Sequence, residues 1–428
     1  KIPYFDENVE ISQYPDIPNN EFTRDEILSM LAKEMLDAAE LLPASQSEVG
    51  RIHKYIALAY AAKIKLYQAY QQDETTHAVT SINKELLREV VSLCDQVTAS
   101  NRYGLLDDFQ GLDLVANENG KESVFAIQYS MNDGTESAGR INWSNLLNSP
   151  GGGSPYGGDG FFLPSQDLIN AYQTDANGLP DFNYQSKSDY SWAVLNNGVY
   201  TLQNTTPNVD PRLDFVVGRP TITWKTYPDK PCEGWVRDKE TYGYNCAKRF
   251  WVSPESSDMF NGWPWGASQL NWQIIRYADI LLWKAEALIE LNEGDGLETA
   301  RDLINQIRNR ARNSAYVKDF NDHSKYAANY LVNPYPADVW NQDYARQALR
   351  WETRLEKALE GERFFDLVRW GIVETTMNKY ITAESDNRIY YANAHFTGGK
   401  DEYYPVPNNQ YGFSGGKYVQ NPGYAPFN

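Results

Sequence analysis

The stretch EGERFFDLVRWG, residues 360–371, places three charged side chains at intervals of three residues among aromatic and apolar neighbours. On a helix, Arg363, Asp366 and Arg369 would share one face, with the carboxylate between two guanidinium groups. Such a cluster could belong to an active site, or it could be a buried structural clamp. A catalytic role needs a nucleophile or a free base nearby, and this stretch contains no His, Ser or Cys. The spacing therefore favours the structural clamp.

Paired carboxylates are a second chemistry to weigh, because a glycosidase needs two acids about 5 to 10 Å apart. Asp107 lies next to Asp108, and Glu118 lies close to Glu122, both in polar sequence. The chain has 57 acidic residues, so close pairs also arise by chance. A glycoside hydrolase is accordingly the weaker interpretation, and no catalytic residue is predicted.

Residue types that usually form metal and phosphate sites are scarce. Four His and three Cys do not favour a zinc site or a Cys–His nucleophile. The run GGGSPYGGDG lacks the Lys-Ser/Thr ending of a phosphate-binding loop and is typical of a surface loop. No cofactor is predicted, although Asp-rich loops would permit a structural Ca²⁺ ion.

The three cysteines have different surroundings. Cys94 lies in an apolar helical stripe, which is typical of a core thiol. Cys232 and Cys246 flank a polar, Tyr-rich segment. A disulfide between them is one interpretation, if the protein is exported, and two unrelated thiols are the other.

Aromatic residues are unusually frequent, with twelve Trp and thirty Tyr, and many lie in Gly/Pro-rich sequence between residues 220 and 270. Tyr and Trp combine an apolar face with a polar group. Their rings could stack on sugar rings while Asn, Asp and Gln bind the hydroxyls. Any single ring could instead fill a gap between loops and helices, but the cluster as a whole predicts a binding surface. The predicted ligand-contacting residues are Trp224, Tyr227, Trp235, Trp251, Trp263 and Trp265.

Helices must position these residues. Thr23 and Glu26 have the spacing of a capping box, and a helical apolar pattern then runs to Pro43. Further helical patterns cover 51–70 and 79–97, and later 271–291, 297–311 and about 338–360. The predicted organisation has helical pairs at about 23–100 and 271–380, a loop-rich insert at about 101–270, and a loop-rich segment at 381–428. Short strands are expected at 123–130 and 213–218.

Charge and hydropathy argue against some classes of binding partner and against a membrane-spanning helix. A net charge of −18 argues against nucleic acid and against anionic lipid surfaces. No apolar run reaches the ~18 residues that a membrane-spanning helix needs. The first residues, KIPYFDENVE, are polar and do not resemble a signal peptide. The chain is therefore expected either to be cytosolic or to have lost an N-terminal segment.

Three stretches in order resemble the SusD/RagB family: IIRYADILLWKAEALIEL with LINQIRNRAR, then EGERFFDLVRWG, then YYPVPNNQ…VQNPGY. The resemblance extends from Thr23 onward. It implies a single domain over 1–428 with a mainly all-α fold, in which tetratricopeptide-like helix pairs form a superhelical scaffold around the irregular insert. A few short strands are expected beside them.

Members of this family are surface-exposed, lipid-anchored nutrient-binding proteins of the Bacteroidetes outer membrane. The resemblance implies a non-enzymatic protein that binds a glycan and passes it to a SusC-like, TonB-dependent outer-membrane transporter. A peptide-binding, RagB-like role is the alternative. The lipid anchor of the family belongs to an N-terminal region that precedes the sequence in hand, so it is inferred only from the resemblance.

Overall fold

The first helices follow directly from capping and small-residue packing. In the computed structural model, Thr23 and Glu26 form the predicted capping box and start α1 (Arg24–Leu41). Asn83 caps α3 (Lys84–Ala99) by accepting the Glu85 and Leu86 N–H groups at 3.0 and 3.2 Å. Between them lies α2 (Lys54–Ala69), which packs against both. Its alanines at 57, 59, 61 and 62 are buried, which allows the close approach of both neighbours.

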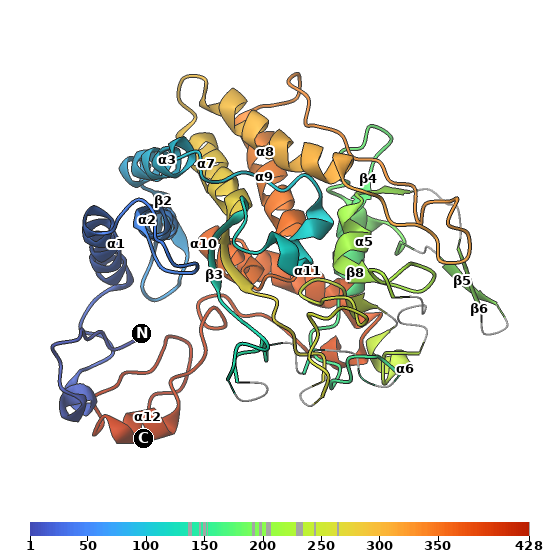
Figure 1. Cartoon of the computed structure of the whole chain (residues 1–428). Coiled ribbons are helices and arrows are strands. Elements are labelled where there is room, and N and C mark those ends of the chain that lie inside the picture. Colours follow the sequence, from blue (N-terminus) through green and yellow to red (C-terminus); the bar gives the residue numbers. More distant parts are fainter. Residues whose placement is uncertain are drawn as a thin grey trace.

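The structure describes residues 1–135, 139–144, 147–148, 151, 153–190, 193–196, 199–202, 207–227, 234–243, 245–262 and 265–427. Within them the mainly all-α fold is confirmed. After the insert, α7 (Tyr277–Leu291) packs against α3 on one side and against α8 (Gly296–Asn313) and α9 (Gln342–Glu356) on the other. The helices on both sides of the insert therefore form one continuous helical frame with a shared apolar core (Figure 1).

The frame ends in two further helices. Leu359 and Gly361 both have positive φ, 67° and 86°, so the chain turns sharply after α9. Then follow α10 (Arg363–Arg369) and α11 (Val373–Ser385). The C-terminal segment contains the 3₁₀ helix η5 (Ile389–Tyr391) and the short helix α12 (Asn408–Phe413).

Strands are short and pair two by two, all antiparallel. The strand predicted at 123–130 is confirmed as β3, whose Ile127 lies opposite Trp272 of β10. The pairs are β1 (Tyr70–Gln72) with β2 (Val79–Ile82), β3 (Ser123–Ile127) with β10 (Trp272–Arg276), β4 (Gln173–Thr174) with β7 (Asn208–Val209), β5 (Ala193–Asn196) with β6 (Val199–Leu202), and β8 (Val217–Gly218) with β9 (Cys246–Ala247).

Two predicted helix boundaries and one predicted strand are wrong. The helix expected from residue 271 begins only at Tyr277, because the preceding residues pair with β3. The helix expected from residue 79 begins at Lys84, because the residues before its Asn83 cap form β2. Residues 213–218 are mostly helical rather than extended, since Pro211 opens a helical turn there.

In its described residues the insert contains the short helices α4 (Gln166–Ala171), α5 (Arg212–Val216) and α6 (Lys239–Tyr242). In Figure 1 α5, α6, β5, β6 and β8 lie on the far side of α7 and α9 from α1 and α2. Further 3₁₀ turns are η1 (Ile11–Asp16) near the N-terminus, and η2 (Phe109–Asp113), η3 (Val115–Asn117) and η4 (Tyr184–Ser186) in the insert. Two apolar clusters separate from the frame core fill the insert and its contact with α9.

Candidate functional site

The motif at 360–371 forms a buried clamp, but with partners that differ from those predicted. Arg369 binds Asp366 at 3.1 Å, as the spacing predicts. Its main partner is Glu286 of α7, which its two terminal nitrogens reach, one of them at 2.7 Å. Glu286 also accepts hydrogen bonds from the Tyr70 hydroxyl and the Trp370 indole, at 2.6 and 2.8 Å. The clamp therefore joins α10 to α7 and to Tyr70, the first residue of β1.

The predicted role of Arg363 in this clamp is wrong. Arg363 makes no ion pair with any described residue, and its side chain lines a cavity beside α9. Asp366, the acid predicted to bind Arg363, pairs with Arg369 instead. Burial raises the pKa of Asp366, and Arg369 opposes that rise.

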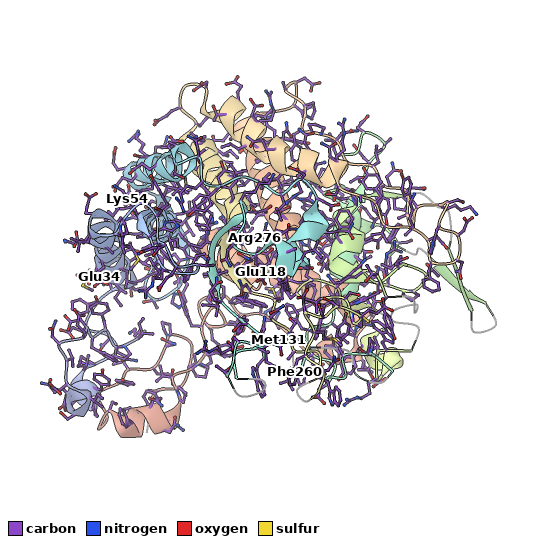
Figure 2. The ribbon with its side chains drawn as sticks, in the orientation of Figure 1. Glu34, Lys54, Glu118, Met131, Phe260 and Arg276 are labelled. Carbon is purple, nitrogen blue, oxygen red and sulfur yellow. The ribbon has the colours of Figure 1, made fainter. Side chains whose placement is uncertain are left out.

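A network of buried ions lies where α9 ends. Arg276 is labelled near the centre of the molecule in Figure 2. It binds Glu122, Glu356 and Glu360 at 2.8, 3.0 and 2.8 Å. Arg310 of α8 binds Glu122 at 3.1 Å and also reaches Glu356. Burial alone would raise the pKa of Glu356, but the surrounding arginines lower it to about 2. The carboxylate is therefore held ionised.

The same network fastens the insert to the helical frame. Arg212 of α5 binds Asp210, Glu352 and Glu356 at 2.7, 2.6 and 3.3 Å. Arg308 of α8 binds the other oxygen of Glu352 at 3.1 Å. These side chains are fully buried, so each charge depends on its partners rather than on water.

The carboxylate pairs weighed for catalysis have structural contacts. Glu122 belongs to the ion network, and Glu118 accepts the Asn271 N–H. Burial raises the pKa of Glu118 to about 7, a value suited to a general acid. However, the cavity beside Glu118 and Glu122 holds only about 10 Å³, enough for about one water molecule. No sugar fits between these two acids in this structure.

The other predicted pair also supports the fold. Asp107 binds Lys121 at 2.9 Å, and Asp108 accepts the Gln110 and Ala315 N–H groups at 2.9 and 3.1 Å. Asp108 thereby caps η2 and holds it against the chain that follows α8.

Three of the predicted binding rings lie inside the insert. The Trp224 indole donates to the Tyr156 hydroxyl at 2.8 Å, and this hydroxyl donates to the Val252 carbonyl at 2.7 Å. The ring centroids of Tyr156 and Trp251 are 4.6 Å apart, and those of Trp224 and Trp235 are 5.2 Å apart. We call these four rings the aromatic cluster. Their burial leaves no free ring face, so the prediction that Trp224, Trp235 and Trp251 stack on a ligand does not fit this structure.

Trp265 is the predicted ring that is clearly accessible, with 55% of its surface exposed. Two glycines allow the chain around it to pack closely. Gly157 has φ +67°, and a Cβ there would lie 3.3 Å from the Trp265 Cβ. Gly266 has φ +76°, and a Cβ there would lie 2.9 Å from the Trp251 ring and 3.0 Å from the Tyr156 Cβ. Trp265 is thus an exposed indole that lies next to the aromatic cluster in the structure.

The glycine-rich run has a role that the sequence reasoning missed. It was interpreted only as a surface loop, yet its Tyr156 is buried at the centre of the aromatic cluster. Further exposed rings of the insert were also not predicted, among them Trp143 at 42%, Phe161 at 59% and Phe162 at 41% exposed. No spacing or repeat in the sequence distinguishes these residues from buried aromatic residues.

Some of the remaining predicted residues lie in the part of the chain that the structure describes, and others lie outside it. Tyr227 is half-buried, with its ring centroid 6.1 Å from that of Trp235. Trp263 lies outside the described residues. Cys94 is a free, buried thiol, and Cys246 is disulfide-bonded. Cys232 also lies outside the described residues, so its pairing with Cys246 stays a prediction.

The described residues bring together no group of three or more His, Cys, Asp or Glu side chains that could hold a metal ion. None of the helices in the described part of the chain has the length and apolar character required to cross a bilayer.

Comparison with known proteins gives a consistent result. The model of the SusD family matches residues 121–424. A SusD-like carbohydrate-binding protein from Bacteroides fragilis is 19% identical, with 96% of this chain and 74% of that chain covered and a TM-score of 0.66. Surface glycan-binding protein A from Bacteroides uniformis is 18% identical, over 98% and 72% of the chains, with a TM-score of 0.60.

A laminarin-binding SusD-like protein is 19% identical, over 99% and 74% of the chains, with a TM-score of 0.55. At these identities the likeness concerns the fold. No curated protein matches the sequence.

Proposed function

The chain belongs to the SusD family, and from this premise we propose that it is a cell-surface protein that binds glycans without chemically changing them. The observation that carries the proposal is the exposed Trp265 indole, which lies beside the buried aromatic cluster. An aromatic ring that is exposed in the free protein can receive the apolar face of a sugar. Structurally similar proteins described as binding laminarin and surface glycans support this choice of ligand class.

We further propose how the bound glycan is used. The protein would be held by a lipid anchor at the outer membrane and would pass its ligand to a SusC-like, TonB-dependent transporter. This part of the proposal rests on the family alone. Purification of the transporter from the native host should recover this protein with it, and two proteins that purify separately at natural abundance would contradict the partnership.

The glycan-binding proposal predicts a specific loss on mutation of the exposed ring. We expect Trp265→Ala to weaken binding of a neutral glucan such as laminarin by about 10- to 100-fold, as loss of one stacking ring costs roughly 1–3 kcal/mol. Isothermal titration with the wild type and the variant measures this change. The residue is exposed, so the melting temperature should hardly move.

Tyr404→Ala is the matched control, because Tyr404 is a 90% exposed aromatic residue of the C-terminal segment, outside the insert. It should bind the glucan as the wild type does. Equal affinities for wild type and Trp265→Ala would show that the glycan surface lies elsewhere. Binding of peptides together with failure to bind any glycan in an array would favour the RagB-like alternative.

A further inference from the structure

A cavity of about 640 Å³ lies between α9, α10 and α11, with part of α4 and η4 on its remaining side. These three helices belong to the helical frame and follow one another in the chain (Figure 1). None of the aromatic residues predicted from the sequence to bind ligand lines this cavity. Its volume is within the range of about 300–1,000 Å³ that is usual for small-molecule sites.

The charge of this cavity is opposite to that of the protein. The net charge of the chain is −18, yet the lining has twice as many basic side chains as carboxylates. The basic residues are Arg346, Arg350, Arg354, Lys357, Arg363 and Lys379.

Every acid in the lining already has a cationic partner. Asp167 binds Arg354 at 2.6 Å, and Asp343 binds Arg346 at 3.0 Å. The third acid, Asp366, is held by Arg369 of the buried clamp. These carboxylates therefore do not neutralise the remaining basic side chains.

Arg350, Arg363 and Lys379 are the basic side chains of the lining that make no ion pair with a described residue. Lys379 is exposed to solvent, whereas Arg350 and Arg363 are half-buried and make no side-chain hydrogen bond with a described residue. Arg350 has only the face of Trp370, with its guanidinium carbon 5.2 Å from the ring centroid. Burial, together with the neighbouring Arg354, lowers the pKa of Arg363 to about 9. Burial also lowers the pKa of Arg350. Nearby carboxylates, Glu286 and Glu290 for Arg350 and Asp366 and Asp167 for Arg363, oppose this lowering only in part. Both guanidinium groups have therefore lost water without gaining a direct ion pair, and an incoming anion would supply one.

The walls of the cavity suit a sugar ring as well as an anion. Trp351, Phe182 and Phe364 present half-buried aromatic surface. The side chains of Thr375 and Thr376 on α11 make no hydrogen bond with another described residue, so their hydroxyls can bind those of a ligand.

Backbone strain is also concentrated at this cavity. Phe162 and Leu359 line it, and both adopt positive φ, 61° and 67°, which is unfavourable for residues with a Cβ. Such conformations persist where the surrounding structure enforces them, and they gather at ligand sites. The ring of Phe162 is 41% exposed at the edge of the cavity.

We propose that this cavity binds an acidic saccharide, with the sugar against the aromatic wall and its carboxylate held by Arg350 and Arg363. This site is separate from the proposed glycan surface around Trp265. It would give the protein a preference for glycans that carry uronic acid units, which the acidic overall charge of the chain would otherwise disfavour.

Isothermal titration with trigalacturonic acid tests the proposal, with galactotriose as the neutral probe of the same length. We expect the wild type to bind the acidic trisaccharide with measurable affinity and the neutral one at least about tenfold more weakly, as a charge-assisted hydrogen bond contributes about 1.5–3 kcal/mol. Arg350→Gln/Arg363→Gln should bind the acidic probe about 10- to 100-fold more weakly than the wild type.

Arg312→Gln is the matched control, because Arg312 is exposed, lies outside the cavity and makes no ion pair with a described residue. It removes one positive charge and should leave binding of the acidic probe unchanged. The Arg350→Gln/Arg363→Gln variant should melt within a few degrees of the wild type, since it removes no ion pair. Should it fail to fold, the single Arg363→Lys variant replaces it, with an intermediate loss of affinity expected.

The proposal is overturned if both trisaccharides bind the wild type equally, if the double variant retains full affinity, or if inorganic sulfate displaces the acidic trisaccharide at the same concentration. Tighter binding of an acidic tripeptide than of trigalacturonic acid would overturn it too. Laminarin binding by the double variant is measured in parallel. A loss confined to the acidic probe concerns the cavity, and a loss confined to laminarin on Trp265→Ala concerns the proposed function.

Discussion

The end of α9 and the aromatic cluster of the insert are stabilised by different forces. At the end of α9 the frame contains fully buried ions, in which Glu356 alone meets Arg212, Arg276 and Arg310. In the aromatic cluster rings contact rings and one hydrogen-bond chain runs from Trp224 to Val252, although buried ion pairs such as Arg219 with Asp214 occur elsewhere in the insert. Buried ions tolerate almost no change, because an unpaired partner is costly. Ring packing tolerates exchange of similar shapes much better. A fixed frame can therefore carry an insert whose surface varies.

The largest expected effect comes from breaking the ion network. Glu356→Ala leaves three buried guanidinium groups short of an acceptor, so we expect it to lower the free energy of unfolding by about 3–5 kcal/mol or more. Chemical denaturation followed by circular dichroism measures this loss. Asp37→Ala removes an exposed ion pair with Lys33 and should cost under about 1 kcal/mol. Equal losses in the two variants would contradict the importance of the buried network.

A smaller effect is expected from the aromatic cluster. Trp224→Phe keeps an aromatic ring but removes the indole N–H that meets Tyr156, and it leaves a small void. We expect a loss of about 1–3 kcal/mol. Hydrogen exchange should show faster exchange in the insert, with α7 and α8 unchanged.

Trp265→Phe provides the control for this variant, because Trp265 is exposed and its replacement should stay within about 0.5 kcal/mol of the wild type. If Trp224→Phe instead loosened the frame and the insert together, the two regions would unfold as one unit.

The smallest expected effect is a pH dependence of stability. It comes from Glu118, which lies at the boundary between the insert and the frame and accepts the Asn271 N–H. Burial raises its pKa in the folded protein from the usual 4.5 to about 7. Between these values the folded state holds more protons than the unfolded state, so Glu118 makes stability fall as pH rises through this window. Glu118→Gln should therefore gain melting temperature relative to the wild type at pH 8 and not at pH 4.5.

Glu255→Gln offers the comparison, since Glu255 is exposed on the insert and makes no ion pair with a described residue. It should show no difference between pH 4.5 and pH 8. A pH-independent effect of Glu118→Gln would mean that the carboxyl group stays ionised in the folded protein.

The sequence predicted the helical frame well, because helical periodicity and the Thr23–Glu26 capping box are local signals. The clamp was predicted only in part. The Asp366–Arg369 pair lies within one turn, but Glu286 is 83 residues away from Arg369, and no local pattern identifies it. The helix starts at Lys84 and Tyr277 were missed for a similar reason, since pairing between strands decided them.

The candidate site was harder to predict than the frame. Composition identified the Trp-rich insert correctly as unusual, but it could not separate the buried Trp224 from the exposed Trp265. That difference depends on how the chain folds around Tyr156, where Gly157 and Gly266 allow close packing. The sequence did not predict the cavity with Arg350 and Arg363. Its positive charge depends on which cations the lining carboxylates bind, and Asp167 and Asp366 bind Arg354 and Arg369.

The contact of Arg212 with Glu352 and Glu356 limits how this protein could be recombined with its relatives. A chimera that exchanges the whole insert would also remove Arg212 and Asp210, and Glu352 and Glu356 of α9 would each lose one of their buried guanidinium partners. A graft that replaces the rest of the insert but leaves residues 208–219 of the recipient in place would keep Arg212 and Asp210 with the recipient frame. Chimeras cut in that way should be soluble and folded, whereas exchange of the complete 101–270 segment should give aggregated protein unless the donor supplies an equivalent arginine.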